Sequence, residues 1–353
     1  MANQTTEHIK ELCKGPETIN IMEVCGTHTV SIMRNGIRSL LPDSIRLISG
    51  PGCPVCVTTQ GYIDAAIDLA RRENIMLCTY GDMMKVPGKD ISLDQQRANG
   101  ADIQVIYSAL DAIKFAQQNP QKEIVFAAVG FETTTPITAA AILQARELGL
   151  KNFTILAGHK LAIPVIELVA QGDAVIDAFL CPGHVSVIIG SDAYIDIATK
   201  YRKPCVVASF EPQQILNAIA KTVEMIVNGQ IGVHNEYKAA VTAKGNIHAQ
   251  ELTARVFDIC DVNWRSIGLV KNSGLRLADE FSSFDAVTKF NLSDIEKDYS
   301  MGGCKCGQVI QGMMDPNQCP HFGNKCLPQS PLGPCMVSSE GTCAAWYKYH
   351  PLD

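Results

Sequence analysis

Short apolar runs alternate with longer amphipathic segments over roughly the first two thirds of the chain. Most of these runs are continuous, without strict alternation of apolar and polar residues, which is typical of strands buried on both faces of a parallel sheet. The predicted strands cover residues 19–24, 45–49, 75–80, 103–107, 124–129, 153–157, 175–181 and 204–209.

The segments between these runs have the spacing and the flanking residues of helices. Apolar side chains recur at helical spacing over residues 61–72. Ser191 is placed to cap residues 192–201, because its side-chain oxygen can accept from the free amides of a first turn. Segments 137–148 and 213–227 each follow a proline, which is favoured in the first helical turn.

The alternation of strands and helices predicts an α/β protein. A chain of 353 residues is long enough for two sheets, so we expect two doubly wound α/β domains with mostly parallel sheets, at 16–128 and 129–228. The alternation fades after about residue 228. We expect residues 229–353 to form a smaller Cys-rich domain, on which residues 1–15 could pack.

Polar loops follow six of the predicted strands. They are CGTHT (25–29), GPGCPVC (50–56), TYGDMMKVPG (79–88), GFETTTP (130–136), AGHK (157–160) and CPGHVS (181–186). The loops at the carboxyl ends of parallel strands form the ligand crevice of an open α/β sheet, so we expect these six to converge. Their polar and soft side chains are Cys25, His28, Cys53, Cys56, Asp82, Lys85, Glu132, His159, Cys181 and His184.

Composition and charge narrow the function classes. Apolar residues make up 46% of the chain and charged residues 19%, which is a globular composition. The net charge of −6 argues against non-specific binding to nucleic acid or anionic lipid. The polar start, MANQTTEHIK, does not resemble a signal peptide, and no apolar run approaches the roughly 20 residues of a membrane helix. We therefore expect a cytoplasmic protein.

Fourteen cysteines are unusual for a cytoplasmic chain, and six of them lie in the last 50 residues. Reducing compartments disfavour structural disulfides, so such clusters more often bind metal or do redox chemistry. The terminal pattern is C-x-C-x12-C-x6-C-x8-C-x7-C, without the C-x2-C pairs of a zinc ribbon. Its spacing leaves iron–sulfur and zinc sites open. Merely buried cysteines are a weak alternative, because this Gly- and Pro-rich segment offers little core.

The motif Cys53-Pro-Val-Cys56 lies between a predicted strand and a predicted helix. The positive end of a helix dipole lowers a thiol pKa and favours the thiolate. We interpret the pair as a redox dithiol. Half of a zinc site and two inert cysteines are the alternatives.

Cys25 and His28 end another predicted strand. The thiol could be a nucleophile or a soft metal ligand that His28 orients, or both side chains could simply be packed. Glu132 is a further catalytic candidate, although taken singly Glu132, His159, His184 and Asp82 are each better explained by a structural role. Walker, dinucleotide-binding and Gly-x-Ser-x-Gly motifs are missing from the sequence.

Together these motifs resemble the HypD family of hydrogenase formation proteins, from about residue 10 to 350. The family's cluster motif, C-x14-C-x6-C-x16-C, maps onto Cys304, Cys319, Cys326 and Cys343. The resemblance implies a C-terminal iron–sulfur domain in which these four thiolates hold a [4Fe–4S] cluster. Cys306 and Cys335 would be a nearby pair of redox thiols.

The resemblance also implies a function, which is the maturation of [NiFe] hydrogenases. Cys25 would hold the iron of a transient Fe(CN)2CO unit, with Cys53 and Cys56 as the redox dithiol beside it. Such a protein is an assembly scaffold with redox activity rather than a conventional metabolic enzyme. Family members work with a HypC-type chaperone and a HypE-type cyanide donor, so we expect a monomer that forms transient complexes. The alternatives are a [4Fe–4S]-dependent protein disulfide reductase and a zinc-stapled interaction protein.

Overall fold

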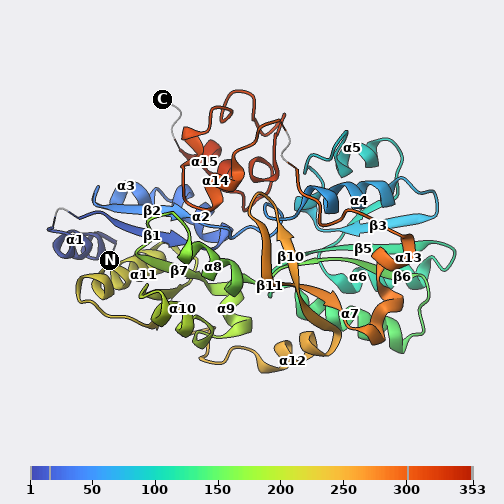
Figure 1. Ribbon diagram of the computed structural model, residues 1–353, viewed down its shortest axis with the longest axis horizontal. Coiled ribbons are helices and arrows are strands. Elements are labelled where there is room, and N and C mark those ends of the chain that lie inside the picture. The colour runs from blue at the N-terminus through green and yellow to red at the C-terminus, as the bar shows by residue number, and fades with distance from the viewer. Residues whose placement is uncertain (1, 16, 300–301, 351–353) are drawn as a thin grey trace.

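A computed structural model describes residues 2–15, 17–299 and 302–350 (Figure 1). Residues 1, 16 and 353, at which predicted domains or segments begin or end, lie outside the described residues. The strands are β1 Ile19–Glu23, β2 Ile45–Ser49, β3 Ile75–Thr79, β4 Ile103–Val105, β5 Glu123–Gly130, β6 Phe153–His159, β7 Ala178–Pro182, β8 Cys205–Ala208, β9 Val233–Asn235, β10 Phe257–Trp264 and β11 Gly268–Leu277.

Helices connect these strands and cover their faces (Figure 1). The α-helices are α1 Ala2–Leu12, α2 Gly26–Arg34, α3 Ile37–Leu40, α4 Gln60–Ala70, α5 Leu93–Ala98, α6 Ala109–Gln118, α7 Thr135–Glu147, α8 Ala162–Gln171, α9 Gly183–Ile189, α10 Ile195–Lys200, α11 Pro212–Val227, α12 Ile247–Val256, α13 Ala286–Phe290, α14 Cys306–Ile310 and α15 Thr342–Tyr349. Short 3₁₀ turns are η1 Gly81–Met83, η2 Asp192–Tyr194, η3 Asp279–Phe284, η4 Pro316–Gln318 and η5 Pro334–Met336.

Two parallel sheets form the framework. A five-stranded sheet has the order β2-β1-β7-β8-β9, and a four-stranded sheet has the order β4-β3-β5-β6. Every neighbouring pair within these two sheets is parallel. The α/β class with mostly parallel sheets is confirmed, and all eight predicted strands are present within a few residues of their expected bounds.

The strand pairing does not follow the division predicted at residue 129. That residue lies inside β5, which pairs with β6 on one side and β3 on the other. Strand β1 pairs with β2 on one side and with β7 on the other, and β7 begins more than 120 residues after β2 ends. The chain therefore leaves the first sheet after β2, builds the second sheet, and returns. Periodicity identifies strands, but only tertiary packing decides which strands are neighbours.

Three apolar cores hold these layers together. One face of the five-stranded sheet packs against α1, α2, α3 and α11, and one face of the four-stranded sheet packs against α6 and α7. The remaining face of each sheet contributes to one continuous core, which includes Phe179 from β7 and Leu77 from β3. Helices α4 and α8 lie over this shared core, which joins the sheets side by side (Figure 1).

The alternation of strands and helices was expected to fade after about residue 228, and the structure there has an antiparallel hairpin, β10-β11, that the sequence did not predict. The hairpin lies between the two sheets (Figure 1), and the backbone of Lys160 bridges to Gly274 in β11. Beyond it, the C-terminal segment 302–350 consists largely of turns, with α14 and α15 as its only α-helices among the described residues. No helix in the described ranges has the length and apolar character needed to cross a membrane.

Candidate functional site

A cavity of about 490 Å³ lies where the two sheets meet. It is lined by residues that follow the carboxyl ends of β1, β2, β3, β5 and β7, as expected for loops of parallel sheets. Five of the six predicted loops therefore converge. The sixth, AGHK, does not reach this cavity, because His159 and Lys160 line a separate cavity of about 330 Å³ beside β11.

Two of the converging loops are locked together by backbone contacts. The amide of Gly26 donates to the carbonyl of Gly52 at 3.1 Å, and the amide of Gly50 donates to Glu23 at 2.8 Å. Gly52 packs so closely on Val24 and Cys25 that a Cβ atom would collide with their backbone. Glycine is required here because only it permits such an approach. The CGTHT and GPGCPVC loops thus form one rigid unit.

Cys25 is the cysteine that lines the cavity, among the residues the structure describes. It is the N-cap of α2, so its thiol lies at the end of the helix where the amides of the first turn are free. Burial raises the pKa of Cys25 to about 12, with a further contribution from the charge of Glu340, while the amides of His28 and Thr27 oppose this shift. Without a cation, this site favours the neutral thiol.

Glu340 is a site residue that sequence reasoning missed. It comes from the C-terminal segment, lines the cavity, and accepts a hydrogen bond from Thr27 Oγ1 at 2.6 Å. Burial raises its pKa, with a smaller contribution from Asp82. Glu340 lies more than 300 residues from Cys25 in the chain, and no spacing rule would have brought it to Cys25.

Glu23 is the last residue of β1, two residues before Cys25, and its side chain is buried. Burial raises its pKa to about 7, although the hydroxyls of Ser49 and Thr29 lower it. Thr29 Oγ1 donates to Glu23 Oε1 at 2.6 Å, while Oε2 is buried without a hydrogen-bond partner among the described residues. This carboxyl can therefore hold a proton near neutral pH.

His28 does not line the cavity. Its ring is fully buried, and Nε2 lies 3.0 Å from the carbonyl oxygen of Ser209. Burial lowers the pKa of His28 to about 4, so the ring is neutral and donates from Nε2 to that carbonyl. His184, in contrast, lines the cavity and stacks on Phe210 with a centroid distance of 3.9 Å. His28 also contacts Phe210, at 5.0 Å, so the aromatic ring connects the two histidines.

The other predicted candidates are spread around the cavity. Glu132 lies behind the wall, where Oε1 accepts from the amide of Ala162 at 2.8 Å and burial raises its pKa to about 7. His159 is buried with Nε2 3.2 Å from Thr138 Oγ1. Cys181 is a fully buried residue of β7, and Lys85 borders a different cavity. These four do not contact the space that Cys25 lines.

Cys53 and Cys56 form a disulfide, with a Cα–Cα distance of 5.3 Å. The intervening residues Pro54 and Val55 line the cavity, whereas the two sulfurs lie just behind it. The amide of Cys56 donates to Cys53 Sγ at 3.2 Å. Amides directed at a sulfur stabilise its thiolate, so the geometry suits a dithiol that can be oxidised and reduced.

Neighbouring cysteines of the C-terminal segment shift one another's pKa values. Hydrogen bonds from Cys304 and Cys335 hold the pKa of Cys306 well below its usual range, and the buried guanidinium of Arg265 adds to this effect. The same contacts raise the pKa of Cys304 and of Cys335. Burial raises the pKa of Cys343, and the charges of three other thiols raise it further, from Cys306, Cys326 and Cys319.

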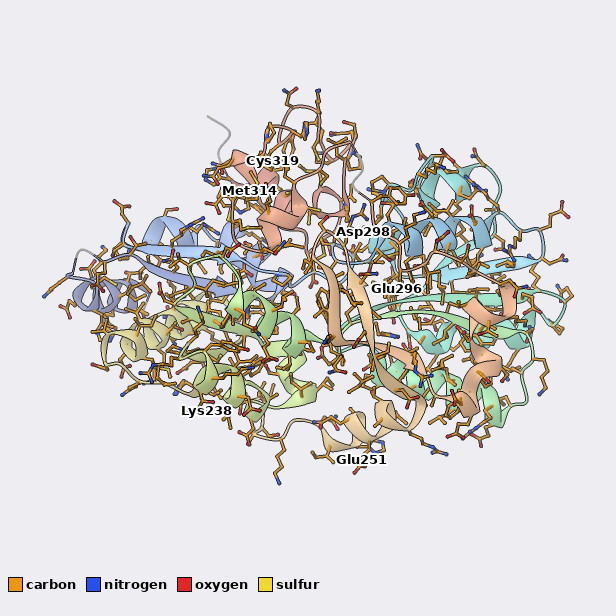
Figure 2. All side chains as sticks on the ribbon, viewed as in Figure 1. Lys238, Glu251, Glu296, Asp298, Met314 and Cys319 are labelled. Carbon is orange, nitrogen blue, oxygen red and sulfur yellow. A yellow bond between two sulfur atoms is a disulfide. The ribbon has the colours of Figure 1, made fainter. Side chains whose placement is uncertain are left out.

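The four cysteines at the predicted ligand positions, Cys304, Cys319, Cys326 and Cys343, all lie in this segment. Cys326 Sγ accepts from the amide of Leu332 at 3.4 Å, and a Cβ atom at Gly333 would lie 2.8 Å from Cys304 Sγ. Within 2–15, 17–299 and 302–350, no three His, Cys, Asp or Glu side chains are arranged to hold one metal ion. A cubane binds its thiolates at four separate corners, so its ligands need not converge on one point. Figure 2 shows Cys319 in this segment.

Comparison with known proteins identifies the family. A family model named HypD, described as "Hydrogenase formation hypA family", matches residues 1–350. The chain belongs to the HypD family. The resemblance found in the CGTHT, GPGCPVC and GFETTTP motifs is thereby confirmed, and HypD-family proteins are hydrogenase maturation factors.

The similarity to individual relatives covers almost the whole of this HypD-family chain. Hydrogenase maturation factor HypD of Azotobacter vinelandii is 46% identical over 93% of this chain and 89% of its own length. HypD of Escherichia coli K12 is 42% identical, covering 98% and 94%. A putative hydrogenase expression/formation protein of Methanocaldococcus jannaschii is 41% identical, covering 100% and 98%.

Proposed function

We propose that this HypD-family chain is the scaffold on which the iron of a [NiFe] hydrogenase receives its cyanide and carbon monoxide ligands. The observation that carries the proposal is the position of Cys25, whose thiol lies on the wall of the cavity between the two sheets. A single soft thiolate in a mostly apolar space suits an iron ion with strong-field ligands, which is the cargo here.

Binding of iron would exchange a proton for a metal cation at the sulfur. The Cys25 thiol gives up its proton as the iron–sulfur bond forms, and the charge that burial disfavours is then compensated by the cation. Glu23, whose charge acts on this thiol, has a buried carboxylate oxygen without a hydrogen-bond partner in the described part of the chain, and burial raises its pKa to about 7, so it can accept the proton. His28 acts indirectly, because its bond to Ser209 holds α2 against β8.

Cys53 and Cys56 would provide two electrons beside this iron. In the exchange we propose, the Cys306 thiolate attacks their disulfide and Cys335 resolves the mixed disulfide. The Cys306–Cys335 pair becomes a disulfide, and Cys53 and Cys56 become a thiol and a thiolate, so electrons and protons balance. When bound by Cys304, Cys319, Cys326 and Cys343, a [4Fe–4S] cluster would supply electrons one at a time to restore the pair.

The proposal includes partners that carry the other ligands of the iron. A HypC-type chaperone would share the iron through the open side of the cavity, and a HypE-type protein would deliver cyanide there. Tyr107 is 95% exposed at the rim of the cavity, and such an exposed aromatic side chain suits a transient contact. This docking is part of the proposal and would occur in the cytoplasm.

Anaerobic purification with infrared spectroscopy and metal analysis tests the function. Wild type should contain iron and acid-labile sulfide, with cyanide and carbon monoxide bands from an additional iron. Cys25→Ser should lose these bands and keep the sulfide. Cys78→Ala, which alters a buried cysteine of β3 outside the cavity, should keep both.

Two other outcomes would contradict the proposal. Iron–sulfur content with a reducible dithiol but without ligand bands would indicate the cluster-dependent disulfide reductase. Colourless protein containing zinc in place of iron would indicate a zinc-stapled interaction protein.

A further inference from the structure

A serine of the C-terminal segment connects the Cys53–Cys56 disulfide to the cavity. Ser338 Oγ lies 3.3 Å from Cys53 Sγ and 3.1 Å from Oδ2 of Asp82, which lines the cavity. Ser338 is 1% exposed, so water does not compete for its hydroxyl. A hydroxyl has a single proton, and Ser338 can therefore donate to the carboxylate or to the sulfur, but not fully to both.

The surroundings allow this hydroxyl to change partner without leaving other groups unpaired. The amide of Glu340 donates to Ser338 Oγ at 3.3 Å, which holds the oxygen in place. Asp82 Oδ2 also accepts from the amide of Ser339 at 3.0 Å and from its hydroxyl at 2.7 Å. Asp82 keeps these two donors if Ser338 turns away, so rotation of one O–H bond is sufficient.

The oxidation state of the cysteines decides which acceptor is stronger. A disulfide sulfur is uncharged and accepts weakly, whereas the Asp82 carboxylate is a strong acceptor. After reduction, the thiolate of Cys53 becomes a charged acceptor, and the amide of Cys56 already points at it from 3.2 Å. No hydrogen-bond donor among the described residues is directed at Cys56 Sγ, so the two sulfurs are not equivalent.

We propose that Ser338 is a positioning residue for the dithiol, donating to Asp82 when the pair is oxidised and to Cys53 when it is reduced. The inference rests on the proposed redox function of Cys53 and Cys56. The disulfide takes up two electrons and one proton to give the Cys53 thiolate and the Cys56 thiol. A dithiol reductant supplies both electrons by forming its own disulfide, and it releases two protons, one to Cys56 and one to solvent. Ser338 therefore favours the reduced pair and places its charge on Cys53.

Redox titration of the full chain tests this inference. Protein is equilibrated anaerobically with oxidised and reduced dithiothreitol, alkylated, and digested, and the Cys53–Cys56 peptide is quantified by mass spectrometry. Ser338→Ala should favour the disulfide about tenfold, which lowers the midpoint potential by about 30 mV for a two-electron step. Ser338→Thr keeps the hydroxyl and should retain the wild-type potential.

Ser339→Ala is the matched control, because Ser339 also donates to Asp82, whereas the hydroxyl beside Cys53 Sγ is that of Ser338. It should leave the potential unchanged. A second variant, Asp82→Asn, tests the inference with Ser338 intact: a weaker competing acceptor should raise the potential. A shift in the opposite direction would overturn the inference.

The inference also fails if Ser338→Ala has the midpoint potential of wild type, or if Ser338→Ala and Ser339→Ala shift this potential equally. Either result would mean that Ser338 only anchors Asp82. Failure of the proposed function looks different. In that case the Cys53–Cys56 pair of the wild type would not respond to dithiothreitol at all, and the inference would fall with it.

Discussion

The two regions that contain the chemistry are built in different ways. Cys25 follows β1 in a five-stranded parallel sheet, where its position is fixed by paired strands and by the tight contact with Gly52. The cysteines of segment 302–350 lie among turns, with one five-residue and one eight-residue α-helix for support. A sheet edge can place one thiol accurately by itself, whereas a turn-rich segment needs its own thiols to be ordered.

The two regions nevertheless meet at one surface. Glu340 packs on Gly26 and accepts from Thr27, and Ser339 donates to Asp82 (their segment lies above the sheets in Figure 1). Buried polar contacts of this kind require close alignment of both partners. The C-terminal segment therefore completes the cavity as well as carrying its own thiols.

The largest effect is expected when the C-terminal segment loses a proposed cluster ligand. Cys343→Ala should remove the proposed cluster that orders residues 302–350. The amide hydrogen exchange of this segment should then accelerate by about a hundredfold or more, while the exchange of the two sheets stays slow. Cys335→Ala is the control, since it removes a neighbouring thiol outside the ligand set. Equal acceleration in both variants would show that the ligands are wrongly assigned.

A smaller effect is expected at the surface where the regions meet. A Cβ atom at residue 26 would collide with the backbone and Cβ of Glu340, so Gly26→Ala should force the segment away from α2. We expect a loss of roughly 3 kcal/mol in the free energy of unfolding, measured by denaturant titration, and faster alkylation of Cys25. Gly81→Ala is the control, because a Cβ atom there meets only Val105 at 3.7 Å. A neutral Gly26→Ala variant would mean that the regions are not in close contact.

The smallest effect concerns a buried carboxyl of the sheet region. Burial raises the pKa of Glu132 to about 7, so between about pH 4.5 and 7 the folded state binds more protons than the unfolded state. The free energy of unfolding must then fall as pH rises through this window. Glu132→Gln should remove a change on the order of 1 to 2 kcal/mol between pH 5 and 7.

Denaturant titrations at several pH values measure this slope. Glu251→Gln, on the exposed surface of α12 (Figure 2), should give a curve parallel to that of wild type. The difference between Glu132→Gln and wild type isolates Glu132 from Glu23, whose pKa is raised, and from His28, whose pKa is lowered. A constant difference across the pH range would contradict the prediction.

Sequence reasoning recovered the local elements better than their assembly. The eight strand predictions were confirmed because continuous apolar runs depend on local burial of both strand faces. The sequence did not predict the hairpin β10-β11, because apolar residues such as Ile259 and Leu269 lie at exposed positions and break the expected alternation of polar and apolar residues. Loop positions were predicted well, but of the ten side chains placed in the crevice only Cys25, Asp82 and His184 line it.

The amino-acid sequence by itself determined the α/β class, the strands, the loops at their carboxyl ends and the family, because these depend on neighbouring residues and on short motifs. Only the tertiary structure decided that β1 and β2 join β7 rather than β3, and that Glu340 and Ser338 come to Cys25 and Cys53. The physical reason is distance along the chain. Pairing across more than a hundred residues is selected by the packing of whole layers, which no local pattern records.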